Sequence, residues 1–203
     1  MYVSTGHNQW TAQEVFGERE GSIACLSWMP SRFELPMIAV GTSTGRVQIW
    51  GNRPTTKSWE RVLELPGHES QPVTDVDWAT CTGRKHHRVA SCGLDGGLQV
   101  HLLMKDPTEE GESRGWTSEA YELHDDAEGN EEWRGGAAAG ERSFSRRVAW
   151  DSMGAVLNSR SEDGTLRMWG RDTDGAWVCV DSLRVNRYDR RTGLTEDASN
   201  ANG

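Results

Sequence analysis

Three side chains that could relay a proton occur within one stretch of the chain: His68, Ser91 and Asp95. A serine, a histidine and a carboxylate are the residue types of a hydrolytic triad, in which the histidine takes the serine proton. Such a serine needs a strained, exposed turn, and Ser91 is not flanked by the glycines of a nucleophile elbow. We therefore interpret the three residues as structural, and we predict no catalytic residue and no enzyme activity.

The residue types that bind metals form one cluster: Cys81, His86, His87 and Cys92, with four residues on either side of the His pair. Structural zinc sites favour cysteine pairs two to four residues apart, and Cys92 is expected on a strand. We favour a solvated loop between two strands over a zinc site. The glycine-rich run at 134–140 lacks the Lys-Ser/Thr of a phosphate loop. We predict no metal and no cofactor.

The net charge and the cysteine spacing limit the classes of protein to which the chain can belong. The 203 residues carry 31 acidic and 22 basic side chains, a net charge of −9, whereas nucleic-acid binding needs a basic face. The apolar runs are too short to span a bilayer, and the four cysteines form no CxxC pair. We predict a reduced intracellular protein with no direct nucleic-acid partner and no membrane insertion.

Tryptophan is the residue that reveals the organisation, with ten copies against three Phe and three Tyr. Three stretches share one frame, in which a Trp is followed by a short apolar run, a turn and a second alternating run. The turn residue lies six positions before the ring at the end of the frame: Thr44 before Trp50, Asp95 before His101, and Asp163 before Trp169. Three copies in one register indicate a repeat protein.

Each repeat predicts four short antiparallel strands. Pairs such as Val47 and Ile49 alternate with polar neighbours, as strands do, and a glycine follows each turn residue, where a hairpin needs a positive φ. A further Trp opens an outer strand after each repeat: Trp59, Trp116 and Trp177. The fold class predicted is all-β, a partial β-propeller of about three four-stranded blades plus one outer strand of a preceding blade.

The domain boundaries follow from these repeats. Residues 1–20 hold the outer strand of an incomplete blade, expected from Gln9 to Phe16. The predicted blades cover 21–67, 68–124 and 143–183. The acidic, Gly/Ala-rich segment 125–142 is predicted to be a disordered insertion, and 184–203 a disordered tail.

The residues around the turns resemble the hydrogen-bonded set of His, Ser/Thr, Asp and Trp found in WD-repeat blades. In the second blade His101 stands in the Trp slot, so we expect that the network cannot be completed in the usual way. In the third blade either Ser159 or Ser161 could supply the hydroxyl. The residues we expect to hold the blades are Trp28, Thr44, Trp50, His68, Trp78, Ser91, Asp95, Trp150, Asp163, Trp169 and Trp177.

The residue sequence of the individual strands resembles the C-terminal half of the Seh-type nucleoporins, in the Sec-thirteen/Seh group of WD-repeat proteins. Cys25 to Arg32, Pro36 to Gly41 and Val47 to Trp50 resemble the fifth blade of that family. The sixth blade is matched by Arg147 to Trp150, Gly154 to Leu157, Glu162 to Gly164, Leu166 to Trp169 and Trp177 to Cys179. The resemblance covers about residues 8–183 and skips the acidic insertion.

The resemblance implies a structural scaffold subunit in the Y-shaped outer-ring complex of the nuclear pore, at the nuclear envelope. The family's open six-bladed propeller is completed by strands donated from a helical nucleoporin. Other outer-ring subunits would be further partners, and the complex supports nucleocytoplasmic transport of protein and mRNA.

Three alternatives remain open. They are a Sec-thirteen-like COPII vesicle coat subunit at ER exit sites, a subunit of a TOR-regulating complex on the vacuole or lysosome, and a free WD-repeat adaptor that binds peptides. The first three blades of the family are absent here. The sequence is therefore either truncated, or the arc covers its edges in another way.

Overall fold

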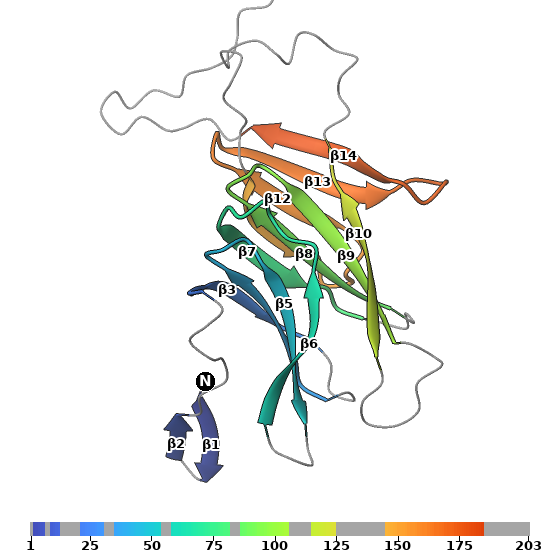
Figure 1. Ribbon diagram of the computed structural model, residues 1–203. Helices are drawn as coiled ribbons and strands as arrows, with labels where there is room; N and C mark the ends of the chain where they lie inside the picture. The colour runs from blue at the N-terminus through green and yellow to red at the C-terminus, as the bar shows by residue number, and fades with distance from the viewer. Residues whose placement is uncertain are drawn as a thin grey trace, which may run out of the picture.

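The computed structural model describes residues 2–6, 9–12, 21–30, 35–53, 58–81, 86–105, 115–124 and 145–184. The regular structure in these ranges is β-strand, arranged as three four-stranded antiparallel sheets and one two-stranded hairpin (Figure 1). The three sheets stack side by side and do not close into a ring among the described residues. The predicted fold class, an all-β partial propeller, is confirmed.

Each sheet is one blade, with its strands paired in chain order. Blade 1 contains β3 (Ile23–Trp28), β4 (Met37–Thr42), β5 (Val47–Arg53) and β6 (Ser58–Leu65). Blade 2 contains β7 (Val73–Trp78), β8 (His87–Gly93), β9 (Leu98–Lys105) and β10 (Trp116–Glu122). Blade 3 contains β11 (Ser145–Trp150), β12 (Leu157–Ser161), β13 (Thr165–Arg171) and β14 (Trp177–Arg184).

The third strand of each blade is longer than the sequence predicts. We expected it to end on the ring at 50, 101 or 169, but β5, β9 and β13 continue to Arg53, Lys105 and Arg171. The extra residues pair with the outer strand, as in the Asn52–Trp59 and Arg171–Trp177 pairs. Hydrogen bonds to a neighbouring strand extend an element beyond its apolar alternation, which sequence periodicity does not report.

The turns that follow β4, β8 and β12 each contain a glycine with positive φ. Gly45, Gly96 and Gly164 have φ of 84°, 86° and 87°, a conformation that costs glycine little. Asp95 and Asp163 brace two of these turns by accepting the N–H of the residue two positions on, at 2.9 and 2.8 Å.

The first turn is braced by a different residue from the one expected. Thr44 occupies the position of Asp95, yet it is Thr42 Oγ1 that accepts the main-chain N–H of Arg46, at 3.0 Å. Thr44 contributes through a 3.0 Å hydrogen bond between its hydroxyl and that of Thr42. In blade 1 the acceptor of this turn is therefore Thr42, at the end of β4, and not the residue at the position of Asp95.

The N-terminal part contains a strand that we did not predict. β1 (Tyr2–Gly6) pairs antiparallel with β2 (Gln9–Ala12), and the hairpin lies apart from the three sheets (Figure 1). The sequence predicts one strand from Gln9 to Phe16. Residues 13–16 lie outside the described residues, as do 125–144 and 185–203, where we placed the insertion and the tail. Arg184, assigned to the tail, is the last residue of β14.

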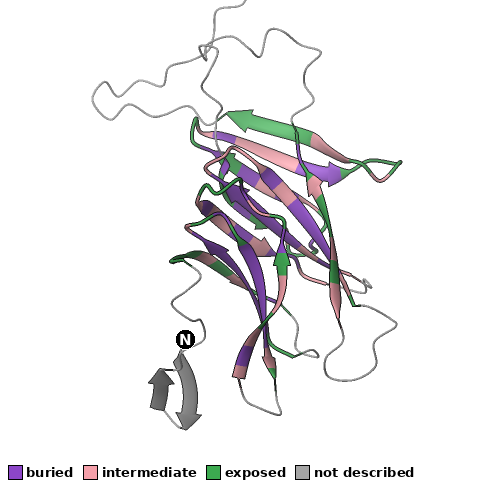
Figure 2. Cartoon of the chain, viewed as in Figure 1, coloured by how far each residue is buried: buried purple, intermediate pink, exposed green. Residues whose placement is uncertain are grey.

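Two of the three buried clusters among the described residues lie between stacked sheets, and the third, made of Ile38, Val40, Trp50 and Trp59, belongs to blade 1 alone. One buried cluster joins blades 1 and 2 and includes Ile49, Val76 and Trp78. A second joins blades 2 and 3 and includes Val100, Leu157 and Trp169. In Figure 2 the buried residues run along the middle strands of the stack, with exposed residues on the outer strand β14. The two shared clusters make each blade depend on its neighbour for part of its burial.

Candidate functional site

Blade 2 contains a continuous chain of four hydrogen-bonded side chains. His68 Nδ1 lies 3.0 Å from Asp95 Oδ1, and its Nε2 lies 3.0 Å from Ser91 Oγ. Ser91 Oγ lies 3.2 Å from His101 Nε2. We expected that the histidine in the Trp slot would leave the network incomplete. Instead His101 Nε2 takes the place of an indole N–H, because both present one N–H donor at the ring edge.

One arrangement of protons satisfies all three contacts between these four side chains. In it His68 donates from Nδ1 to the Asp95 carboxylate, the Ser91 hydroxyl donates to His68 Nε2, and His101 Nε2–H donates to Ser91 Oγ. His101 is neutral in this arrangement. Burial, with a smaller contribution from His68, lowers the pKa of His101 to about 3. His101 Nδ1 has no hydrogen-bond partner among the described residues.

The same geometry has the residue types of a hydrolytic triad, but its nucleophile is not accessible. Ser91 and His68 are both 0% exposed. A substrate carbonyl must approach the serine oxygen within contact distance, and no path to Ser91 is open. The network holds the loop before β7 to strands β8 and β9.

The chain does contain one match to the Gly-x-Ser-x-Gly pattern, from Gly41 to Gly45. It lies in the hairpin turn between β4 and β5, not in the strand-to-helix elbow that activates a nucleophile. The Ser43 hydroxyl accepts a hydrogen bond from Ser22 Oγ at 2.9 Å. This match therefore supplies no catalytic arrangement.

In blade 3 one of the two candidate serines bonds to the tryptophan, and the other does not. The indole Nε1 of Trp169 donates to Ser159 Oγ at 2.9 Å, inside the core. Ser161 instead accepts from Arg167 NH1 at 3.1 Å. Ser161 stands where blade 2 has Gly93, and a Cβ at Gly93 would lie 2.6 Å from the His68 ring. In blade 3 the Ser161 side chain therefore lies where blade 2 has the His68 ring.

Blade 1 uses a third solution. Val40 occupies the position of Ser91 and Ser159, so the hydroxyl is missing. Trp50 donates its indole N–H to Gln48 Oε1 at 3.0 Å. Gln48, Val40 and Trp50 are buried, at 2%, 1% and 9% exposure. Sequence reasoning missed Gln48, because a glutamine two residues from a tryptophan is not part of the repeat pattern.

A second set of aromatic contacts recurs at the far end of each blade, linking the inner and outer strands. Trp28 packs edge-on against Trp59 with ring centroids 5.7 Å apart, and the rings of Trp150 and Trp177 are tilted at 59° with centroids 5.8 Å apart. In blade 2, His87 lies between Trp78 and Trp116, at 5.9 and 5.5 Å. The recurring Trp slots inferred from the sequence therefore bring rings together across each sheet.

The neighbouring inner strands are joined by side chains of β7. Asp77 Oδ1 accepts from Ser27 Oγ of blade 1 at 3.1 Å, and Asp77 Oδ2 accepts the Trp150 N–H of blade 3 at 2.7 Å. Asp75 Oδ2 accepts the Val148 N–H at 3.1 Å. These carboxylates replace the main-chain partners that the inner strands lack, since β3, β7 and β11 belong to different sheets.

Burial raises the pKa of Asp75, although the hydrogen bond from Val148 and the charge of Arg147 act in the opposite direction. Arg147 NH1 lies 3.7 Å from Asp75 Oδ1. The equivalent of Asp77 in blade 3 is Ala149, which has no polar side chain to offer a following strand. The sequence analysis named neither aspartate, because both occupy polar positions of an ordinary alternating strand.

The cluster of metal-ligand residue types is divided between separate surroundings. His87 is packed between the two tryptophans of blade 2, and Cys92 Sγ contacts Thr74 Oγ1 at 3.2 Å. Cys81 Sγ donates to the His86 carbonyl at 3.4 Å. In the described ranges no three His, Cys, Asp or Glu side chains gather as a metal site requires. The four cysteines are free thiols.

The two terminal blades expose apolar side chains that the middle blade buries. Leu26 and Trp28 of β3 are 52% and 47% exposed, whereas their equivalents in blade 2, Val76 and Trp78, are each 3% exposed. At the other end Leu183 of β14 is 59% exposed, and its equivalent Leu123 is 6% exposed. Leu26, Trp28 and Leu183 therefore present apolar surface of the kind that is covered at the internal junctions, although Ile38, Val40, Trp50 and Trp59 of blade 1 are buried.

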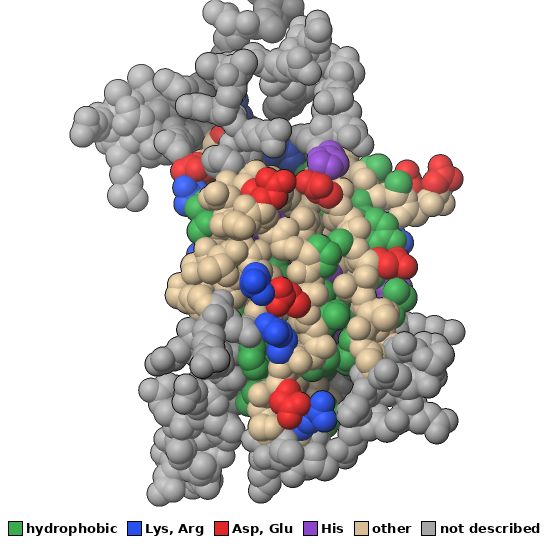
Figure 3. Space-filling model, viewed as in Figure 1, with side chains coloured by type: hydrophobic (Ala, Val, Ile, Leu, Met, Phe, Trp, Pro, Cys, Tyr) green, Lys and Arg blue, Asp and Glu red, His purple; other side chains and the backbone are tan. Residues whose placement is uncertain are grey.

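Acidic and basic side chains are interspersed on the described surface. On the face shown in Figure 3, basic side chains lie beside acidic ones. Arg46 and Arg61 both pair with Glu64, at 3.0 and 3.2 Å, and Arg53 pairs with Glu60 at 2.6 Å. The described part of the chain contains no helix of the length and apolar character that a membrane span requires.

Comparison with known proteins identifies the relatives. The chain is 30% identical over 189 residues to nucleoporin SEH1-A of Xenopus laevis, a match covering 87% of this chain and 47% of the relative. It is 28% identical over 191 residues to nucleoporin SEH1 of Homo sapiens, covering 88% of this chain and 48% of the relative. The chain is a relative of the Seh1 nucleoporins.

More distant matches agree with this result. Nucleoporin seh1 of Schizosaccharomyces pombe is 25% identical over 170 residues, covering 80% of this chain and 48% of the relative. The Seh1-related chain thus spans about half the length of the curated relatives that it matches. No family model matches it.

The solved β-propeller domain of Cps50 (Swd1) from Myceliophteria thermophila superposes with a TM-score of 0.53 at 15% identity. That match covers 80% of this chain and 42% of the solved chain. At this identity the comparison shows the fold alone, and it agrees with the repeat organisation of a WD-repeat β-propeller.

Proposed function

We propose that this Seh1 relative is a structural scaffold subunit of the outer ring of the nuclear pore complex, the Y-shaped complex. The observation that carries the proposal is its similarity to Seh1 nucleoporins over 87% of the chain. In this role it binds other outer-ring subunits at the nuclear envelope and supports transport of protein and mRNA through their assembly, without catalysis of its own.

The partner we propose is a helical nucleoporin that adds strands to the propeller. The exposed apolar residues of the terminal blades support this mode, because they repeat the positions that are buried between blades. Ala149 leaves the last inner strand without the carboxylate that holds β11 to β7, so a following strand there must be held by other contacts. Strand addition supplies main-chain hydrogen bonds to an unpaired neighbour.

The test is affinity purification of the tagged protein from its own cells, followed by quantitative mass spectrometry. Helical and propeller nucleoporins of the outer ring should be enriched in stoichiometric amounts. Recovery of vesicle-coat subunits alone, of a TOR-regulating complex alone, or of no stoichiometric partner would each contradict the pore assignment. A Trp28→Ala variant should reduce the recovery, whereas Tyr121→Ala, in the outer strand of blade 2, should retain the same partners.

A further inference from the structure

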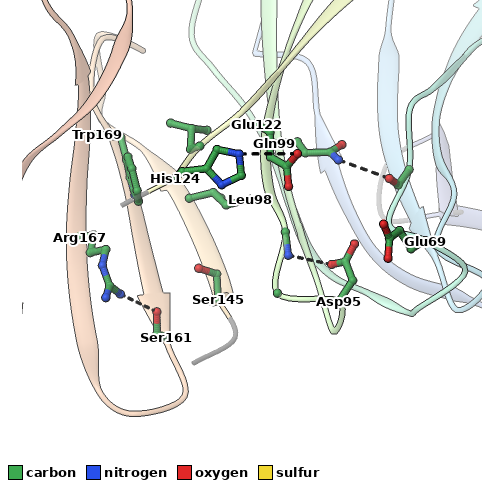
Figure 4. A pocket seen from close by; sticks show the side chains of 14 residues that line it. Glu69, Asp95, Leu98, Gln99, Glu122, His124, Ser145, Ser161, Arg167 and Trp169 are labelled. Atoms are coloured by element: carbon green, nitrogen blue, oxygen red, sulfur yellow. Dashed lines mark hydrogen bonds and ion pairs between the residues drawn. The ribbon is translucent and has the colours of Figure 1, made fainter. Parts of the chain in front are cut away.

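A pocket of about 600 Å³ opens between blades 2 and 3, on the side of the hairpin turns (Figure 4). This volume lies within the roughly 300–1,000 Å³ range of small-ligand sites. Leu98, Leu123 and Trp169 form its apolar part, and each of the three is at most 6% exposed, so these side chains are fixed by the core. The pocket has a rigid apolar floor.

Acidic groups dominate the blade 2 side of this pocket. Glu69, Asp95 and Glu122 line it, against Arg167 on the blade 3 side. The Asp95 carboxylate is already engaged by His68 and by the Gly97 N–H. Arg167 donates to Ser161 at 3.1 Å. Glu69 is exposed, and Glu122 is 56% exposed with only a 3.8 Å contact to His124. These two carboxylates are the groups available to a ligand.

A buried acceptor lies beside the acidic side. Gln99 Nε2 donates to the Gly67 carbonyl at 3.4 Å, which fixes the orientation of the amide. Its Oε1 is buried and has no hydrogen-bond partner among the described residues. A buried carbonyl without a donor costs stability unless a donor is supplied, and such groups call for an explanation.

Backbone strain occurs at the rim of the same pocket. Glu69 and Ser70 have φ of 27° and 61°, and they are the two non-glycine residues with positive φ in the described ranges. Residues other than glycine adopt positive φ at a cost of about 1–3 kcal/mol, and such strain clusters at ligand-binding sites. The strained loop carries the Glu69 carboxylate at the pocket.

We propose that this pocket binds a basic side chain, Lys or Arg, presented by a peptide segment of a partner protein. The aliphatic stem lies along Leu98, Leu123 and the edge of Trp169. The cationic head group donates hydrogen bonds to Glu69 and Glu122. Long basic side chains combine an apolar stem with a charged end, which is the pattern of this pocket. This binding is independent of strand addition at the terminal blades.

The experiment is ligand-observed saturation-transfer NMR, which tolerates a large protein, so the chain can be studied in whichever assembly it purifies. The probes are the capped tripeptides acetyl-Gly-Arg-Gly-amide, acetyl-Gly-Lys-Gly-amide and acetyl-Gly-Glu-Gly-amide. The Arg and Lys peptides should show saturation of their side-chain methylene protons, and the Glu peptide should not. Equal signals from the Glu peptide, or no signal from any peptide, would overturn the proposal.

The matched variants separate the pocket from general charge. Glu69→Gln with Glu122→Gln keeps the shape and removes the two free carboxylates, so the dissociation constant should rise roughly three- to tenfold. Glu60→Gln with Glu64→Gln removes the same charge from β6 in blade 1 and should leave binding unchanged. Equal weakening by both double variants would show non-specific attraction to an acidic protein and would refute a specific site.

Discussion

The main-chain N–H of Trp150 donates to Asp77 Oδ2 at 2.7 Å, and its indole Nε1 donates to the Asp77 carbonyl at 3.2 Å. One residue of blade 2 thereby fixes both the backbone and the side chain of the tryptophan of blade 3. Asp77 also accepts from Ser27 of blade 1. The side chain of Asp77 is therefore the point at which all three blades are joined.

Replacing Asp77 with Ala should lower the free energy of unfolding by about 1–3 kcal/mol, because a main-chain N–H and the Ser27 hydroxyl lose their acceptor. Chemical denaturation monitored by tryptophan fluorescence measures this change. Asp174→Ala, in the exposed turn before β14, is the control and should change stability by less than about 0.5 kcal/mol. Equal effects of the two substitutions would show that the junction does not depend on Asp77.

Trp169→Ala should destabilise the protein by about 3–5 kcal/mol, the range for a buried large aromatic residue. Trp169 is 3% exposed and bonds to Ser159. Trp150→Ala should also destabilise, through the contacts with Asp77 and Trp177. Trp133→Ala, in the acidic segment 125–142 outside the described residues, is expected to change the melting temperature little. Comparable shifts for Trp133 and Trp169 would contradict the blade register.

Gly93→Ala should destabilise blade 2 by roughly 1–3 kcal/mol, the usual cost of overpacking. A Cβ there would lie 2.6 Å from the His68 ring, which is 0% exposed and held by Asp95 and Ser91. Gly170→Ala is the matched control, because its Cβ would meet only Val180 at 3.3 Å. Val180 is 57% exposed and can move. A thermal melt in which Gly170→Ala is the more damaging change would contradict this packing.

His101 makes stability depend on pH. Its pKa falls from the ordinary 6.5 to about 3 in the folded protein. Between these values the unfolded chain binds a proton that the folded chain does not, so the stability present above pH 6.5 is lost as pH falls. The contribution of this one group reaches at most about 1.4 kcal/mol per pH unit.

The measurement is urea unfolding at pH 7.5, 6.5 and 5.5. His101→Trp, which places in blade 2 the residue found in the other two blades, should reduce the pH dependence. His124→Gln, which replaces a 65% exposed histidine, should retain it. An unchanged pH dependence in His101→Trp would show that another group is responsible.

The sequence predicted the parts of the fold that depend on local chemistry. Glycines at 45, 96 and 164 predicted the hairpins because few other residues adopt positive φ. The six-residue interval from turn to ring predicted the strand register. The tryptophans predicted a recurring slot, which the ring pairs of each blade now account for.

Contacts between blades could not be predicted from the sequence, because they join residues about 50 to 75 positions apart. Asp77 looks like any polar residue of an alternating strand until β11 is placed beside it. His101 looked like a defect in the repeat, yet Ser91 lies within reach of its Nε2. Gln48 became a partner of Trp50 only because Val40 removed the hydroxyl. Each of these required three-dimensional proximity.

The measurement that tests the account most directly is size-exclusion chromatography with light scattering, on residues 1–203 alone and co-expressed with a helical outer-ring nucleoporin. The exposed apolar residues of β3 and β14 predict that the chain alone is oligomeric or aggregated. Co-expressed with the helical partner, it should elute as a defined, soluble complex. A monodisperse 22.6 kDa monomer that melts cooperatively and does not associate with that partner would contradict the account.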